Sequence, residues 1–161
     1  MRVVSNTSPL SNFAVIGKIA LLQQIYPKIV IPPAVYDELM RLREIQPMVT
    51  SSVSAGWLEI QTPTNFQLIQ ILQQTLDHGE SEAIALALQL KVDRLLIDER
   101  LGRSIATQYG LSIRGILGIL INAKDQGLIP ALKPLLDQLI IQAGFRVERT
   151  LYEYSLREVG E

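Results

Sequence analysis

Short apolar segments rich in β-branched residues alternate with amphipathic helical segments, and this alternation constrains the fold more than any other feature of the chain. Five segments fit strands, at residues 2–5, 28–31, 57–60, 94–97 and 111–113. Residues 94–97 form a continuous apolar run typical of strands buried on both faces. Strands separated by helices pair in parallel and are covered by those helices. We therefore predict an α/β fold, a three-layer α/β/α sandwich around a mainly parallel sheet.

Helices are expected between and after these strands, at residues 8–15, 19–25, 34–44, 50–55, 66–76, 80–90, 99–109, 115–127, 131–143 and 150–159. Ser8 before Pro9 has the pattern of an N-cap followed by a proline at the first helical position. Pro47 is expected to close the helix over residues 34–44. Repeats, low-complexity tracts and linkers are absent from the sequence. We expect one domain over residues 1–161, with a helical C-terminal extension from about residue 130.

Composition excludes several classes of protein. Hydrophobic residues make up 48% of the chain and charged residues 19%, which excludes disorder. Cysteine is absent, which excludes disulfides, thiolate zinc sites and cysteine nucleophiles and fits a reducing compartment. The N-terminus lacks a signal-peptide pattern and no apolar run is long enough for a membrane span, so we expect a cytoplasmic protein without membrane contact. The net charge of −1 argues against a protein that coats nucleic acid, but not against an enzyme that holds RNA through a metal ion and a few arginines.

Polar side chains follow the predicted strands at the edge where open parallel sheets bind ligands. Asp98 and Glu99 come directly after the strand over residues 94–97, and residues 6–8 follow the first strand. Asp98 alternatively caps the next helix, and Glu99 alternatively favours the dipole of that helix. Both interpretations stay open on the sequence.

Four further acidic residues lie on predicted helices. Glu38 shares a helix face with an apolar residue and can point into a cleft at the rim, whereas Asp37 is interpreted as solvated. Glu80 and Glu82 lie two positions apart, so their side chains diverge by about 200° and only one can face a site. Glu80 suits the first-turn dipole position. Glu82 continues an apolar face, where a carboxylate needs a positive partner such as a divalent metal ion.

Four segments in sequence order, at residues 3–10, 31–39, 79–87 and 96–103, resemble PIN domains (PilT N-terminus). The resemblance extends from the start of the chain to about residue 125. It is closest to a PIN-like branch described as predicted nucleic-acid-binding proteins. It implies an α/β/α sandwich in which three or four acidic residues converge on Mg²⁺ or Mn²⁺. Many members are toxin ribonucleases of bacterial toxin–antitoxin pairs.

The resemblance also implies roles for particular residues. The second family acid corresponds to Glu38, the third to Glu82 and the fourth to Asp98 or Glu99, and these four are the predicted catalytic and metal-binding carboxylates. Asn6 stands where the family normally has an aspartate, and we keep it in the predicted metal site because an amide oxygen can bind Mg²⁺. The predicted substrate contacts are Thr7, Ser8 and Arg103, with a solvated side chain as the alternative for Arg103. His78 is interpreted as a loop residue and not as a ligand.

Three functional hypotheses follow. The first is a metal-dependent ribonuclease that hydrolyses RNA phosphodiesters as the toxin partner of a small antitoxin protein. The second is a catalytically weakened PIN-like module that binds nucleic acid or a partner protein, with Asn6 marking the loss of activity. The third assigns the acids to helix caps and makes the apolar stripe within residues 135–141 a dimerisation surface, although core packing explains that stripe equally well. The resemblance favours a homodimer.

Overall fold

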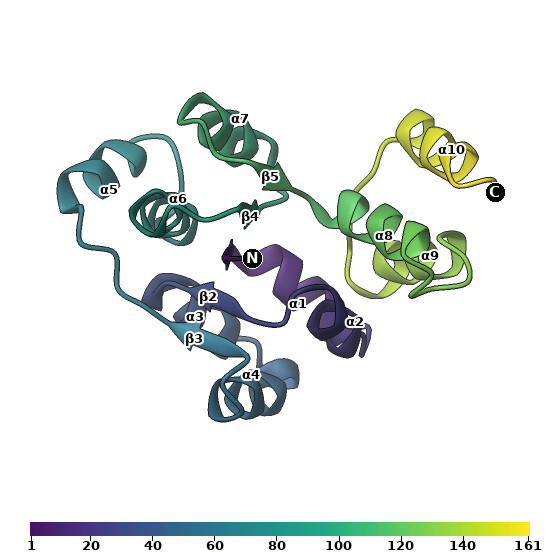
Figure 1. The fold of residues 1–161 in the computed structure, drawn as a ribbon, viewed down its shortest axis with the longest axis horizontal. Helices are drawn as coiled ribbons and strands as arrows, with labels where there is room; N and C mark the ends of the chain where they lie inside the picture. Colours follow the sequence, from purple (N-terminus) through teal and green to yellow (C-terminus); the bar gives the residue numbers. More distant parts are fainter.

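The computed structural model describes residues 1–161, and its centre is a five-stranded parallel sheet (Figure 1). The strands follow the order β3-β2-β1-β4-β5. Their bounds are β1 Val3–Ser5, β2 Ile29–Ile31, β3 Leu58–Ile60, β4 Arg94–Leu96 and β5 Ile113–Arg114. The observed sheet confirms the predicted α/β fold, and all of its strand pairs are parallel.

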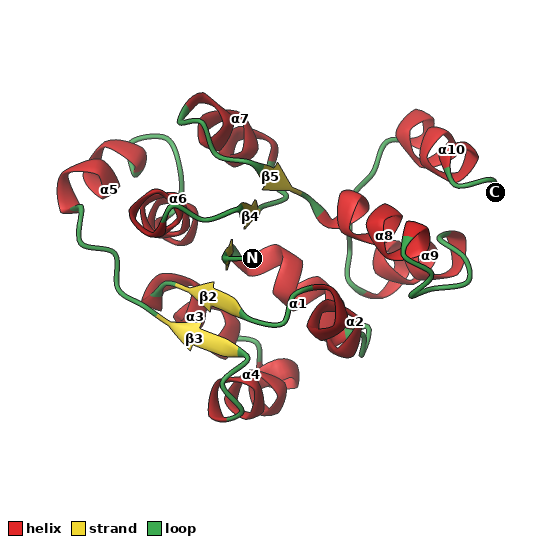
Figure 2. Cartoon of the chain, in the orientation of Figure 1, coloured by secondary structure: helices red, strands yellow, loops and turns green.

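Helices make up most of the remaining structure, as Figure 2 shows by colour. They are α1 Thr7–Val15, α2 Ile19–Ile25, α3 Pro33–Met40, α4 Gln46–Ser54, α5 Phe66–Leu72, α6 His78–Leu90, α7 Arg100–Gln108, α8 Ile116–Asp125, α9 Lys133–Gln142 and α10 Arg149–Glu158, with a 3-10 turn η1 at Arg43–Ile45. Helix α6 lies against β1 and β4 and packs against α3 and α5. Helices α1, α2, α8 and α9 gather on the other side of the sheet (Figure 1). None of the helices has the length and apolar character that crossing a membrane requires.

Local signals near prolines were the least reliable part of the sequence prediction. Helix α3 ends at Met40 instead of continuing to residue 44, and Pro47 lies in the first turn of α4 instead of closing the preceding helix. Proline lacks an N–H group, and the first helical turn leaves that group unpaired, so proline is compatible with a helix start. For the same reason Pro9 fits inside the first turn of α1, which begins at Thr7, one residue before the predicted cap.

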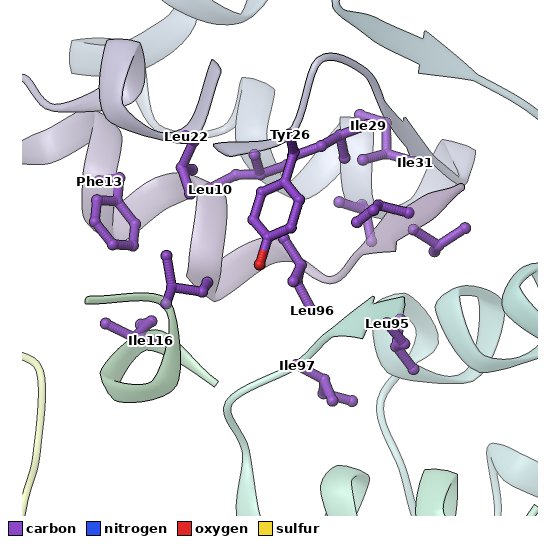
Figure 3. Packing of buried hydrophobic residues seen from close by; sticks show 14 of the residues in the cluster. Leu10, Phe13, Leu22, Tyr26, Ile29, Ile31, Leu95, Leu96, Ile97 and Ile116 are labelled. Carbon is purple, nitrogen blue, oxygen red and sulfur yellow. The ribbon is translucent and has the colours of Figure 1, made fainter. Parts of the chain in front are cut away.

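Buried side chains from both faces of the sheet form one hydrophobic cluster. Phe13, Leu22, Leu96 of β4 and Ile116 of α8 are among its members (Figure 3). The apolar stripe proposed for dimerisation contributes three buried residues to this core, Leu135, Leu136 and Leu139, whereas Ile141 is 80% exposed. Most of the stripe therefore serves core packing.

Candidate active site

The carboxyl ends of β1 and β4 meet the N-terminal turn of α6 at one edge of the sheet. Parallel strands followed by returning helices produce this arrangement, because each helix starts at the edge where a strand ends. The Asn6 N–H group, directly after β1, donates to the Leu96 carbonyl at 2.8 Å and extends the pairing of β1 with β4 by one residue. Residues that follow both strands therefore share one rim.

Asn6 is the most unusual polar residue on this rim. It is 4% exposed, and its side-chain oxygen Oδ1 is buried without a hydrogen-bond partner. A buried acceptor without a donor destabilises a fold by about 1–3 kcal/mol. A buried oxygen without a partner therefore indicates a role other than stabilising the fold, and cation binding is one such role.

Glu38 reaches the same rim from α3. The Thr7 hydroxyl donates a hydrogen bond to Glu38 Oε2. The carboxylate also lies against α6, because a Cβ atom at Gly79 would be 2.5 Å from Glu38 Oε1. Glycine at this position lets the carboxylate approach the first turn of α6, where the helix dipole favours negative charge. The structure therefore brings together two of the predicted site residues, Thr7 and Glu38.

Glu80 lies in the first turn of α6, as predicted, and has two further structural features that were not predicted. It forms a capping box with Asp77: the Glu80 N–H group donates to Asp77 Oδ1 at 2.8 Å, and the Asp77 N–H group donates to Glu80 Oε1 at 3.3 Å. Its side chain is also 6% exposed, and a Cβ atom at Gly102 of α7 would be 2.6 Å from Glu80 Oε2. Burial raises the pKa of Glu80 to about 7, and the charges of Asp77 and Glu99 add to the rise.

A buried carboxyl group that titrates near neutral pH is a candidate catalytic group. The Asp-x-x-Glu spacing at residues 77–80 could have indicated the capping box. It could not indicate burial against α7, because that contact depends on how two helices distant in sequence pack.

Glu82 faces a different neighbour. Its Oε1 atom accepts a hydrogen bond from the Ala34 N–H group at 3.0 Å, and its Oε2 atom lies 2.9 Å from His78 Nε2, a contact that is an ion pair when the imidazole is protonated. Ala34 lies in the first turn of α3, where N–H groups lack partners within the helix. His78 is the first residue of α6 and not a loop residue. The Glu82 carboxylate therefore links the first turns of α3 and α6.

Asp98 and Glu99 follow β4 at the rim, as predicted, and their side chains have different environments. Asp98 Oδ1 accepts a hydrogen bond from the Ile116 N–H group at 3.0 Å, so Asp98 caps α8 and not the helix that follows it directly. Glu99 is exposed at the N-cap position of α7 and makes no side-chain capping bond. Arg103 is exposed, and a Cβ atom at Gly115 would lie 2.9 Å from Asp98 Oδ1 and 3.3 Å from Arg103 Nη1.

Ser8 completes the set of predicted substrate contacts. It is half-buried in the first turn of α1, and its carbonyl oxygen accepts a hydrogen bond from the Asn12 side chain at 2.9 Å. Ser8 also lines a cavity of about 580 Å³ together with Asp98 and Glu99. These three predicted residues therefore border one hollow of the surface.

The predicted convergence of the carboxylates on one point is not found in the structure. No group of three or more histidine, aspartate or glutamate side chains has an arrangement that could hold a metal ion. The donors of the rim nevertheless suit Mg²⁺ chemically, because the orphaned Asn6 oxygen and the Glu38 carboxylate are oxygen donors. Mg²⁺ commonly keeps several waters and uses only one or two carboxylates, so the set fits a hydrated ion better than an enclosed one.

Comparison with known proteins identifies the family. A search of curated proteins found no match. A family model described as PIN domain matches residues 2–161, nearly the whole chain. The parallel sheet order and the acidic rim at its carboxyl edge agree with this match. The chain therefore belongs to the PIN-domain family, a nuclease-type family whose members generally use divalent metal ions.

Proposed function

We propose that this protein is a divalent-metal-dependent ribonuclease that hydrolyses RNA phosphodiesters. The orphaned Oδ1 atom of Asn6 carries the proposal, because it is a buried oxygen donor on the residue that precedes Thr7, whose hydroxyl group donates to the Glu38 carboxylate. Mg²⁺ or Mn²⁺ bound among these donors would lower the pKa of a bound water and offset charge on the phosphoryl oxygens. Family membership supports the nuclease chemistry.

The side chains of the rim have different roles in this proposal. Glu38, oriented by Thr7, and Asn6 supply oxygen donors to the ion. Glu80 accepts or donates a proton near neutral pH, because burial has raised its pKa to about 7. Glu99 is exposed beside Glu80 and is available on the substrate side.

Glu82 and Asp98 act mainly as positioning residues in the proposal. Their hydrogen bonds to Ala34 and Ile116 fix the first turns of α3 and α8. A direct role of either carboxylate at the metal ion would require it to leave these partners.

Ser8 and Arg103 are proposed to contact the phosphate backbone. A phosphate oxygen accepts hydrogen bonds from hydroxyl and guanidinium groups, and both residues border the rim. We further propose that the enzyme is a toxin inhibited by a small antitoxin protein, because many members of the PIN-domain family are toxins of this kind.

The test compares two neighbouring acids on α3. Glu38→Gln removes the charge of the rim carboxylate, whereas Asp37→Asn removes an exposed charge one residue away. Purified protein with MnCl₂ is expected to cleave structured RNA. Glu38→Gln is expected to reduce the rate by about 100-fold or more, and Asp37→Asn to leave it unchanged. Equal cleavage by wild type and Glu38→Gln would remove Glu38 from the reaction.

A second candidate function is supported by a specific observation. The lack of a group of three carboxylates, together with Asn6 in place of an aspartate, favours a module that binds nucleic acid or a partner protein without cleaving RNA. Calorimetric titration with MnCl₂ separates the two candidates. Heat of binding in the wild type that is lost in Glu38→Gln supports the nuclease, whereas RNA binding without metal binding or cleavage supports the module.

A further inference from the structure

A cavity of about 420 Å³ lies between β5, α8 and α10, and its lining is strongly basic. Four arginines line it, Arg94, Arg103, Arg114 and Arg146, and Asp98 is its only carboxylate. The chain as a whole has a net charge of −1, so the positive charge is concentrated locally. The volume falls within the range of about 300–1,000 Å³ that is usual for small-ligand sites.

The four guanidinium groups lack carboxylate partners. The ion pairs of the protein are Lys28–Glu59, His78–Glu82, Lys124–Glu161, Lys133–Asp137 and Arg149–Glu153, and none includes a residue of the cavity. Arg94 and Arg114 are half-buried, and Asp98 already accepts a bond from the backbone of α8. Arg94 donates a long hydrogen bond of 3.5 Å to the Ile113 carbonyl, but no negative charge offsets these partly buried cations, so an anion in this cavity would be stabilised.

Two glycines of the α8 start let the arginine side chains lie close to the backbone. A Cβ atom at Gly118 would be 3.1 Å from Arg114 Cγ, so Arg114 runs over the surface of α8. A Cβ atom at Gly115 would be 3.3 Å from Arg103 Nη1. These contacts place the half-buried Arg114 and the exposed Arg103 along the wall of the cavity.

The cavity adjoins the hollow at the rim that is lined by the predicted site residues Ser8 and Glu99. Asp98, Phe145 and Arg146 line both this cavity and the hollow that contains Ser8 and Glu99. Phe145 and Arg146 belong to the connection between α9 and α10, which crosses from the core to the last helix in Figure 1. A ligand chain at the acidic rim can therefore extend past this connection to the arginines.

We propose that the arginine cavity binds a nucleotide of single-stranded RNA adjacent to the scissile phosphate, an assignment that rests on the proposed ribonuclease function. Guanidinium groups bind phosphate oxygens through paired, charge-assisted hydrogen bonds. Phe145 and Tyr154 in the lining offer aromatic faces to a base. Sites for single-stranded nucleic acid combine positive charge, which binds the phosphate backbone, with aromatic side chains, on which the bases stack.

RNA binding without metal tests the assignment. A short fluorescein-labelled oligoribonucleotide is titrated with the full chain in EDTA and followed by fluorescence anisotropy. The double variant Arg114→Gln/Arg146→Gln is expected to weaken the Kd by about tenfold or more, with the salt dependence of log Kd reduced by about 0.7 for each lost phosphate contact. Arg157→Gln is the matched control, because Arg157 is exposed on α10 outside the cavity and should leave the Kd unchanged. Equal thermal unfolding of all three proteins confirms that they fold.

The results separate this assignment from the ribonuclease proposal. Unchanged affinity in the double variant overturns the cavity assignment, even if RNA is still cleaved with Mn²⁺. Weakened RNA binding supports the cavity assignment, even if the wild type cleaves nothing with any metal. If inorganic phosphate binds the wild type but not the double variant while the RNA affinities are equal, the cavity is a free-anion site and the RNA assignment is overturned.

Discussion

Glu80→Gln should stabilise the protein at alkaline pH and leave its stability nearly unchanged at acidic pH. The pKa of Glu80 is raised from 4.5 to about 7, first because the group is buried and then because Asp77 is negatively charged nearby. The folded protein thus binds this proton more tightly than the unfolded chain does. Its free energy of unfolding falls as pH rises from about 4.5 to about 7, and the loss is complete above that range.

The magnitude follows from the two pKa values. At about 1.4 kcal/mol for a tenfold change in proton affinity, a rise from 4.5 to about 7 corresponds to roughly 3 kcal/mol. Glutamine imitates the protonated acid in shape and keeps an oxygen that can accept the bond from the Asp77 N–H group. The substitution should therefore remove the charge and retain the capping box.

Urea denaturation of the wild type and Glu80→Gln at pH 5 and pH 8 measures this effect. We expect Glu80→Gln to have an advantage in free energy of unfolding of less than about 1 kcal/mol at pH 5 and of roughly 3 kcal/mol at pH 8. Glu99→Gln is a control at an exposed site and should give a much smaller change. A wild-type protein whose stability does not fall over this pH range, or a variant with the same pH dependence, would refute the argument.

Three further substitutions examine contacts of the rim. Gly102→Ala would place a Cβ atom 2.6 Å from Glu80 Oε2, and we expect a loss of about 1–3 kcal/mol in urea denaturation. Glu82→Ala removes the acceptor of the Ala34 N–H group and should lower the free energy of unfolding by about 1 kcal/mol, whereas Glu82→Gln should retain most of it. Asn6→Asp adds a buried carboxylate and should lower the Tm without metal, and MnCl₂ should raise the Tm more in this variant than in the wild type. Equal Tm shifts in Asn6→Asp and wild type would argue against a cation at residue 6.

The fold could be predicted largely because its signals are local. Each observed strand coincides with a predicted apolar run to within two residues at either end, and the order of strands and helices alone implies a parallel sheet. The errors in the predicted helix bounds occurred at proline, which is compatible with both the end and the start of a helix. Pro47 can end a helix or begin one, and only the packing of η1 and α4 decides between them.

The candidate site could be predicted only in part, because its details depend on contacts between distant elements. The spacing of Glu80 and Glu82 along the helix correctly predicted that their side chains point to different neighbours. The predicted first-turn position of Glu80 agrees with the capping box. The sequence could not reveal which of the two carboxylates would be met by a backbone N–H group of α3. Asp98 shows the same difficulty, since it caps a helix that begins 18 residues later.

A structural partner does not by itself remove an acid from catalysis, because a carboxylate fixed by one hydrogen bond is already oriented for its second oxygen to act. The partners of Glu38, Glu80, Glu82 and Asp98 are therefore compatible with a site and with simple capping alike. Asn6 differs, because its buried Oδ1 atom has no hydrogen-bond partner and gains nothing from capping. If the rim had only a structural role, an apolar residue of similar volume at position 6 would make the fold more stable than asparagine does. The orphaned Oδ1 atom is thus the feature that a capping explanation leaves unexplained and that the proposed cation at the rim would explain.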